Sequence, residues 1–212
     1  MLEAVRIDMD TYPRREHFDY FRKMAYPYVG LTAEVDITDF LDAVHRRETP
    51  FFLNFLYQAA TAAISVPELR RRIDGEGIVE YSSCPTSHTL ALPDGTYCYC
   101  LLEYELPVDE FIPYALERQR LALEAPSLDE GEDTLPLMFI TSVPWLSYTG
   151  LVQPTPSPAD SNPRISWGGY REVNGRTLMP VSVLVNHALA DGLHISRFYA
   201  ALNENLARFA AE

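Results

Sequence analysis

The sequence predicts an α/β fold with a largely mixed sheet, and three patterns support this prediction. Segments rich in β-branched and aromatic residues occur together with segments of helical periodicity, without strict alternation of the two. Several expected strands follow one another with only Pro, Asp or Gly turns between them. A further segment near the C-terminus is apolar at nearly every position, which is typical of a strand buried on both faces.

Length and composition predict one domain over residues 1–212. Domains usually run to about 100–200 residues, and 47% of these residues are hydrophobic, which is enough for a full core. The net charge of −13 argues against nucleic acid as the main partner, because phosphate backbones require basic surfaces. No apolar run reaches the roughly 18 residues that span a bilayer, and the first residues lack the apolar core of a signal peptide. We therefore expect a cytoplasmic protein that does not associate with membranes.

The first half of the chain is expected to fold into helices followed by a group of strands. Residues 51–66 are apolar nearly all round, so they predict a buried helix that ends at Pro67. The expected elements are, in order, a short helix at 14–25, a strand at 31–37, a helix that begins at Asp36 or Thr38, the buried helix at 51–66, and strands at 78–83, 88–93 and 96–106.

The three cysteines do not form an even disulfide framework. Cys98 and Cys100 lie two residues apart in an expected strand and therefore face the same side of it. Two small core side chains are favoured there over a metal or redox site. Cys84, like the other two, is expected to remain a thiol.

In the second half, a helix is expected at about 108–124 and a strand at 137–143. Residues 153–163 carry four prolines and no apolar periodicity, which favours an exposed loop, with a linker or part of a pocket rim as alternatives. The nearly continuous apolar segment 177–187 predicts a buried strand, in which Pro180 indicates a bulge or a neighbouring edge. The last helix is expected at about 192–210.

The segment VNHALADGLH at 185–194 carries the strongest chemical signal. His187 ends the buried strand, where rigid elements hold it, and its unperturbed pKa near 6.5 suits a general base at neutral pH. Asp191 stands before the last helix and can orient His187, cap that helix or pair with a distant arginine. A structural histidine and a metal site formed with His194 are the alternatives; the metal site is disfavoured because no further matched ligand accompanies the spacing.

Several segments, in the same order along the chain, resemble the chloramphenicol acetyltransferase family. The pattern H-x-x-x-D-G between a buried strand and the C-terminal helix resembles the active-site signature of acyl-CoA-dependent acyltransferases, a group that also includes dihydrolipoyl acyltransferases and peptide-synthetase condensation domains. Condensation domains are much longer, and dihydrolipoyl acyltransferases carry lipoyl and linker segments that this sequence does not show. The similar segments are RREHFDYF at 14–21, EVDITDFL at 34–41, PWLSYTG at 144–150 and the run from Tyr170 to Phe198.

The resemblance implies a two-layer, mixed-sheet fold and a homotrimer with active sites at the subunit boundaries. It implies that His187 removes the proton from an acceptor hydroxyl, which then attacks the thioester of acetyl-CoA. Ser147 matches the serine that donates a hydrogen bond to the tetrahedral oxyanion. Asp191 matches a structural aspartate, and Arg14 matches its ion-pair partner. No metal is implied.

The resemblance also implies residues of the acceptor site. Ser166 stands where the family has a threonine that binds an active-site water, and Tyr20, Phe21 and Val29 match positions of the acceptor pocket. Asn186 replaces the first histidine of the usual His-His pair, which is not the base, so the chemistry is expected to survive.

The departures from the family pattern leave the acceptor open. Gly169 stands where the family often has a lysine near the CoA phosphate, and Ala25 and Val29 are smaller than the residues common in the acceptor pocket. The expected function is acetyl transfer from acetyl-CoA to chloramphenicol or a related small hydroxylated compound, which is an antibiotic-resistance activity. The alternatives are an acyltransferase with another acyl chain or acceptor, and a catalytically idle trimer that binds a small ligand.

Overall fold

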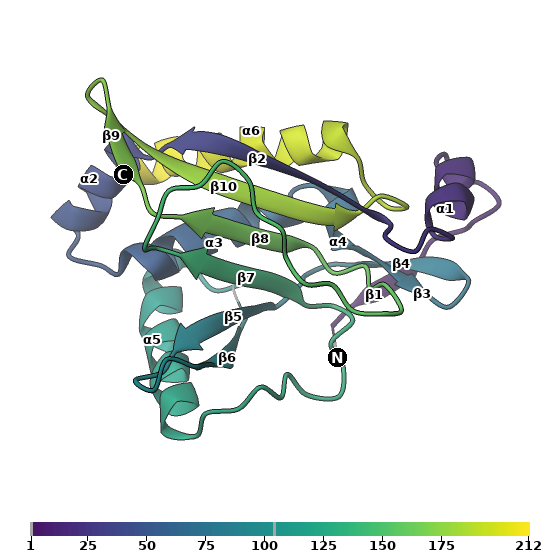
Figure 1. Cartoon of the computed structure of the whole chain (residues 1–212), viewed down its shortest axis with the longest axis horizontal. Helices are drawn as coiled ribbons and strands as arrows, with labels where there is room; N and C mark the ends of the chain where they lie inside the picture. The colour runs from purple at the N-terminus through teal and green to yellow at the C-terminus, as the bar shows by residue number, and fades with distance from the viewer. Residues whose placement is uncertain (1, 104) are drawn as a thin grey trace.

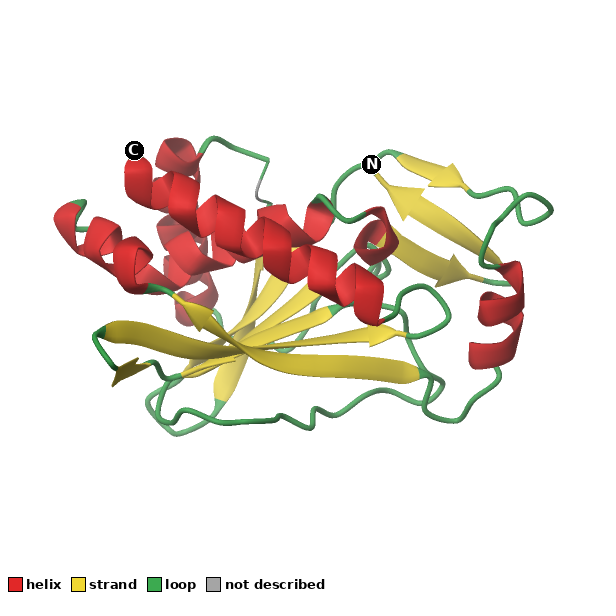
Figure 2. Cartoon of the chain, turned by 90° about the horizontal axis from the view of Figure 1, so that it is seen from above, coloured by secondary structure: helices red, strands yellow, loops and turns green. Residues whose placement is uncertain are grey.

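Helices cover one face of a central sheet, and a long loop crosses the other face (Figures 1 and 2). The computed structural model describes residues 2–103 and 105–212. The elements along the chain are β1 (Ala4–Arg6), α1 (Arg15–Phe21), β2 (Tyr28–Asp36), α2 (Thr38–Arg46), α3 (Phe51–Ile64), α4 (Pro67–Arg70), β3 (Arg71–Asp74), β4 (Gly77–Tyr81), β5 (Thr86–Ala91), β6 (Tyr97–Leu102), α5 (Val108–Glu124), β7 (Met138–Val143), β8 (Arg164–Gly168), β9 (Arg171–Val173), β10 (Arg176–Asn186) and α6 (Gly192–Ala211).

The prediction of a mixed sheet is confirmed. Within the described residues, seven strands form the large sheet in the order β2-β10-β8-β7-β5-β6, with β9 paired to β10. Strand β7 runs parallel to both β5 and β8, whereas β10 runs antiparallel to β2 and β8. The long strand β10 lies inside the sheet and is buried along most of its length, as its apolar sequence predicts.

The main core lies between the sheet and the helices α2, α3 and α6 (Figure 2). Four alanines of α3, Ala59, Ala60, Ala62 and Ala63, are fully buried and let its backbone approach its neighbours closely. Helix α6 buries its apolar stripe on the same side, including Phe198 and Leu202. Cys98 and Cys100 are both buried, as expected of small core side chains. None of the described helices combines the length and apolar character that a bilayer crossing requires.

The structure contains short strands that the sequence did not predict. Strands β1, β3 and β4 form a small three-stranded sheet among the described residues, and only β4 had been expected. Strand β3 has the sequence Arg-Arg-Ile-Asp, which carries too few apolar residues to show a strand period. Strand β8 is five residues long and entirely buried, so its alternation is too brief to read from the sequence.

The structure corrects the prediction for Pro67 and decides between the two alternatives given for Pro180. Pro67 does not simply end the buried helix, because α3 ends at Ile64 and Pro67 begins the short helix α4 at its first turn, where a missing N–H costs nothing. Pro180 causes no bulge, because the pairing of β10 with β2 continues through it. The pairing of β10 with β8 begins one residue later, at Val181, so Pro180 lies at the edge of that ladder.

Candidate active site

His187 follows the last residue of β10 and is held by contacts on three sides. Its Nδ1 lies 3.0 Å from the carbonyl oxygen of Ala190. Because a carbonyl can only accept, Nδ1 carries the proton and Nε2 keeps a free lone pair. The ring stacks on Phe21 with 3.9 Å between centroids, and the backbone N–H of His187 donates to the Pro27 carbonyl at 2.7 Å. The half-buried imidazole therefore has the tautomer and the rigidity that a general base needs.

Asn186 holds the turn that carries His187. Its side-chain oxygen accepts from the backbone N–H of Ala188 at 3.0 Å, and its amide nitrogen donates to the carbonyl of Asp160 at 2.8 Å. The backbone carbonyl of Asn186 accepts from the N–H groups of Leu189 and Ala190. Asn186 thus links the turn to the loop that precedes β8.

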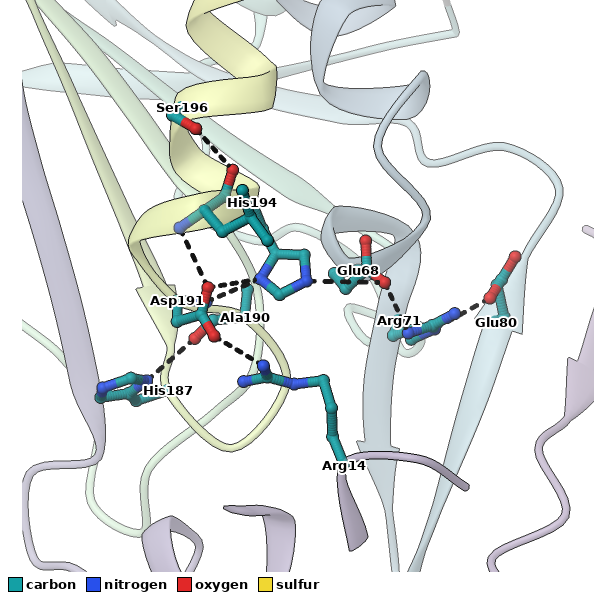
Figure 3. A network of polar contacts seen from close by, with 10 residues as sticks. Arg14, Glu68, Arg71, Glu80, His187, Ala190, Asp191, His194 and Ser196 are labelled. Carbon is teal, nitrogen blue, oxygen red and sulfur yellow. Dashed lines mark hydrogen bonds and ion pairs between the residues drawn. The ribbon is translucent and has the colours of Figure 1, made fainter. Parts of the chain in front are cut away.

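Asp191 caps α6 and pairs with Arg14 across the chain (Figure 3). One carboxylate oxygen accepts from the backbone N–H of Leu193 at 3.0 Å, and the other accepts from Nη1 of Arg14 at 2.6 Å. Burial alone raises the pKa of Asp191, but the hydrogen bond and charge of Arg14, together with His194, hold this pKa at about 2. Of the three roles left open for Asp191, capping and pairing are both present, and no hydrogen bond joins its described side chain to that of His187.

His194 extends this network to α4, a role that the sequence analysis missed (Figure 3). Its Nδ1 accepts from the backbone N–H of Asp191 at 3.1 Å and lies 2.8 Å from the Asp191 carboxylate. Its Nε2 lies 3.7 Å from Glu68, which pairs with Arg71 at 3.0 Å. His194 occupies the third position after the cap, from which its side chain reaches back to the cap backbone and completes a capping box. Among the described residues, no group of three or more His, Cys, Asp or Glu side chains is arranged to hold a metal ion.

Ser147 lies in an exposed segment after β7, and two glycines determine where this segment lies. A Cβ at Gly169 would stand 2.7 Å from the carbonyl oxygen of Pro144, and one at Gly168 would stand 2.9 Å from that of Leu146. The backbone N–H of Gly169 also donates to Leu146 at 2.8 Å. Only glycines therefore let the residues around Ser147 lie so close to the end of β8.

Ser147 and His187 do not meet within one chain. The hydroxyl of Tyr148, next to Ser147, lies 3.4 Å from Oγ of Ser182 in β10. Ser182 precedes His187 by five residues, which corresponds to about 16 Å along a strand. No hydrogen bond joins the described side chains of Ser147 and His187, the two residues implied to act on the same reacting group.

Ser166 belongs to a row of hydroxyl side chains that crosses the sheet. In register, Thr141 of β7 stands beside Ser166 of β8, Ser166 beside Ser182 of β10, and Ser182 beside Thr32 of β2. Thr32 and Ser182 are joined by a hydrogen bond of 2.7 Å. The Oγ of Ser166 is buried and has no hydrogen-bond partner among the described residues. A buried hydroxyl of this kind fits a position that a water or a substrate atom completes.

The three residues expected in the acceptor pocket lie in different surroundings. Phe21 stacks on His187, and Tyr20 is exposed with its ring edge-on to Phe21 at 5.1 Å. Val29 stands opposite Val185 and packs against the main core, so it does not reach the open face of a single chain.

A cavity of about 840 Å³ lies on the open face of the sheet, and the sequence did not predict it. Strands β5, β6 and β7 form its floor, and the loop between β7 and β8 forms its rim. Residues 153–163 form no helix or strand and contribute Gln153, Pro154, Pro156 and Asp160 to the rim. The loop is exposed over much of its length, as expected, but its last residues, 161–163, are buried, and it is also the pocket rim given as an alternative.

A partly buried ion pair lies at the wall of this cavity. Arg164 donates from both terminal nitrogens to the carboxylate of Asp160, at 2.9 and 2.7 Å. The same carboxylate accepts from the hydroxyl of Tyr28 at 2.9 Å, and burial together with Asp160 raises the pKa of Tyr28. The guanidinium group of Arg164 lies over the ring of Phe139 at 5.1 Å. Through the contact of Asn186 with Asp160, the cavity wall and the His187 turn are connected.

The chain is similar to known proteins over nearly its whole length. The family described as chloramphenicol acetyltransferase matches residues 2–203. The chloramphenicol acetyltransferase of Streptomyces acrimycini is 30% identical, over 95% of this chain and 93% of its own. Chloramphenicol acetyltransferase 3 of Escherichia coli is 25% identical, over 96% and 97%.

Solved structures share the fold. A chloramphenicol acetyltransferase superposes with a TM-score of 0.82 at 24% identity, covering 96% of this chain and 100% of the other. A probable dihydrolipoamide acetyltransferase from Listeria monocytogenes superposes with a TM-score of 0.66 at 15% identity, covering 97% and 94%. These likenesses establish the mixed α/β fold of CoA-dependent acyltransferases for this chain.

Proposed function

The chain belongs to the chloramphenicol acetyltransferase family, and from this premise we propose that it transfers an acetyl group from acetyl-CoA to a hydroxyl of chloramphenicol or a related small molecule, with His187 as the general base. Members of this family are acetyl-CoA-dependent acyltransferases, so the enzyme class follows from membership. The observation that carries the assignment of the base is the contact of His187 Nδ1 with the Ala190 carbonyl, because it leaves Nε2 free to accept a proton.

The proposed reaction is a single acyl exchange. Nε2 of His187 takes the proton of the acceptor hydroxyl while the hydroxyl oxygen forms a bond to the thioester carbon. The resulting oxyanion collapses, the carbon–sulfur bond breaks, and the imidazolium returns the proton to the CoA thiolate. Acetyl ester and CoA are the products, and no other reactant is required. General base catalysis of this kind contributes about 10²–10⁴ in rate.

Ser147 is proposed to stabilise the oxyanion with its hydroxyl. Its exposure supports this role, because the hydroxyl is free to face a partner group outside its own segment. One such donor is worth about 10²–10³ in rate. Pro144 and Trp145, which line the cavity, precede Ser147 by three and two residues, and this supports an acceptor site close to the donor.

We propose a homotrimer in which His187 of one subunit faces the cavity and Ser147 of the next. The separation of His187 from Ser147 within one chain supports this assembly, since a second copy is needed to complete the site. Large apolar side chains on the same face support it too: Trp145 is 79% exposed and Val152 93% exposed. Exposed apolar side chains that lie together are typical of surfaces that a partner covers.

The test is the release of CoA thiol from acetyl-CoA, with and without chloramphenicol, in the wild-type chain and in His187→Ala. We expect chloramphenicol-dependent release that the substitution lowers by about 10²–10⁴-fold. The matched control is His45→Ala, which removes an exposed histidine of α2 and should leave the rate unchanged. Full activity in His187→Ala would refute the proposed base.

The same assay separates the alternatives. Release with other hydroxylated compounds, but not with chloramphenicol, would indicate a different acceptor. Binding of a small hydroxylated ligand without release from any acyl-CoA would indicate an idle binding protein. Sedimentation of the purified chain tests the trimer, and a monomer that is fully active would exclude a shared site.

A further inference from the structure

The charges that line the cavity are unbalanced. Within the described part of the chain, three charged side chains line it: Glu130, Asp160 and Arg164. Arg164 is bound through both terminal nitrogens to Asp160, so these two charges neutralise each other. Glu130 has no described cation beside it and accepts a hydrogen bond from the hydroxyl of Ser87. The net charge of the cavity lining is therefore negative, and its source is Glu130.

Glu130 is held in place by the floor of the sheet. Ser87 belongs to β5 and is buried, so its hydroxyl directs the Glu130 carboxylate toward that floor. A carboxylate has about four acceptor sites, and Ser87 occupies one of them. Burial, the adjacent Tyr97 and the Glu130 carboxylate together raise the pKa of Tyr99, which places this carboxylate near the aromatic wall of the cavity.

Aromatic rings surround the same space. Tyr97 and Tyr99 of β6 lie with 5.8 Å between ring centroids, and Phe139 and Trp145 line the cavity from β7 and the loop that follows it. The face of an aromatic ring attracts a cation, and Phe139 already receives the guanidinium of Arg164 in this way. A carboxylate beside several ring faces is the combination of groups that binds ammonium ions.

We propose that the acceptor taken by this cavity is a small hydroxylated molecule that carries a protonated amine, with Glu130 as the counter-ion of that amine and the aromatic wall around it. This inference rests on the proposed function, since it names the acceptor class for the same site. A neutral acceptor such as chloramphenicol should then be used less efficiently than a related acceptor that carries a protonated amine.

A matched pair of acceptors tests the inference. Chloramphenicol is a neutral amide, and the amine that remains after its acyl group is removed from nitrogen keeps the same hydroxyls and is a cation at neutral pH. We expect the amine to be acetylated on oxygen, as shown by mass and NMR spectra of the product, with a kcat/KM at least about tenfold above that of chloramphenicol. A single charge-assisted hydrogen bond contributes enough binding free energy to account for a tenfold difference in kcat/KM.

Glu130→Gln is the decisive variant. It should lower kcat/KM for the amine by about tenfold or more, mainly through KM, and lower the ratio of kcat/KM for the amine to kcat/KM for chloramphenicol by a similar factor. Glu132→Gln is the matched control, because this exposed residue of the same loop does not line the cavity. Equal use of the two acceptors by the wild type, or no effect of Glu130→Gln on the amine, would overturn the inference.

Calorimetric binding of the amine, without acetyl-CoA, separates this inference from the proposed function. Binding that depends on Glu130, without CoA release from any acceptor, would support the cationic ligand and refute acetyl transfer. CoA release with chloramphenicol, without preference for the amine, would support acetyl transfer and refute the cationic acceptor. Absence of both binding and release would refute both.

Discussion

Removal of the Arg14 charge should destabilise the protein in a pH-dependent way. The change is Arg14→Gln, which deletes the ion pair with Asp191 and leaves the Asp191 cap of α6 in place. The pKa of Asp191 is lowered from 3.8 to about 2. Because each pKa unit is worth about 1.4 kcal/mol, this shift corresponds to an upper limit of about 2.4 kcal/mol of folding free energy.

The expected loss is smaller than this limit. The Asp191 side chain is 29% exposed, so solvent screens part of the interaction. Nε and Nη2 of Arg14 are buried without described hydrogen-bond partners, and deleting them removes an unfavourable contribution. We therefore expect Arg14→Gln to lower the free energy of unfolding at pH 7 by about 1–2 kcal/mol.

The pH dependence has a definite sign. The pKa of Asp191 is lower in the folded state than in the unfolded chain, so the stabilisation is present in full above about pH 4 and is lost as the pH falls toward 2. The difference between wild type and Arg14→Gln should accordingly be constant from pH 7 to 5 and shrink below pH 4.

Urea denaturation at fixed protomer concentration measures this difference, since an oligomer's stability depends on concentration. Arg15→Gln is the control, because Arg15 forms an exposed pair with Asp19 that is worth less than about 0.5 kcal/mol. A loss in Arg14→Gln that stays the same from pH 7 to pH 3 would show that packing, and not the ion pair, accounts for it.

Two further predictions concern the segment that carries the proposed oxyanion donor. Ser147→Ala should lower kcat by about 10²–10³ and leave the unfolding midpoint unchanged, as steady-state kinetics and urea denaturation would show; a rate within twofold of wild type would exclude the role. Gly169→Ala should lower kcat by about tenfold or more, because its Cβ would stand 2.7 Å from the Pro144 carbonyl and displace Ser147. Gly192→Ala has no atom within 4 Å of its Cβ and serves as the control; equal kcat in both glycine variants would contradict the close approach.

Long elements with a sustained period were predicted well. The expected helix at 108–124 coincides with α5, and the strand expected at 177–187 is shifted by one residue from β10. The helix expected at 14–25 ends early, at Phe21, and the next strand begins already at Tyr28. The chain between them is too short and irregular for periodicity to place the boundaries.

In the candidate site, too, residues with a local sequence signal were predicted and residues that depend on distant contacts were not. His187 and Asp191 were predicted because strand end, turn and helix cap are adjacent in the sequence, and each leaves a local signal. The partner of Asp191 was predicted only through the family resemblance, because Arg14 lies 177 residues away along the chain. His194 was considered only as a metal ligand, and its capping role was missed because the sequence signature of a capping box has Glu or Gln at this position.

By itself, the sequence determined the mixed α/β class, the position of His187 at the end of a buried strand and the cap at Asp191, because each depends on residues within a few positions of one another. Only the tertiary structure decided the cavity, the Asp160–Arg164 pair at its wall, the carboxylate of Glu130 and the place of Ser147 beside two glycines. Those features arise where β5, β6, β7 and the loop before β8 come together in space. Contacts between distant segments follow from packing and sheet register, and no local period in the sequence records them.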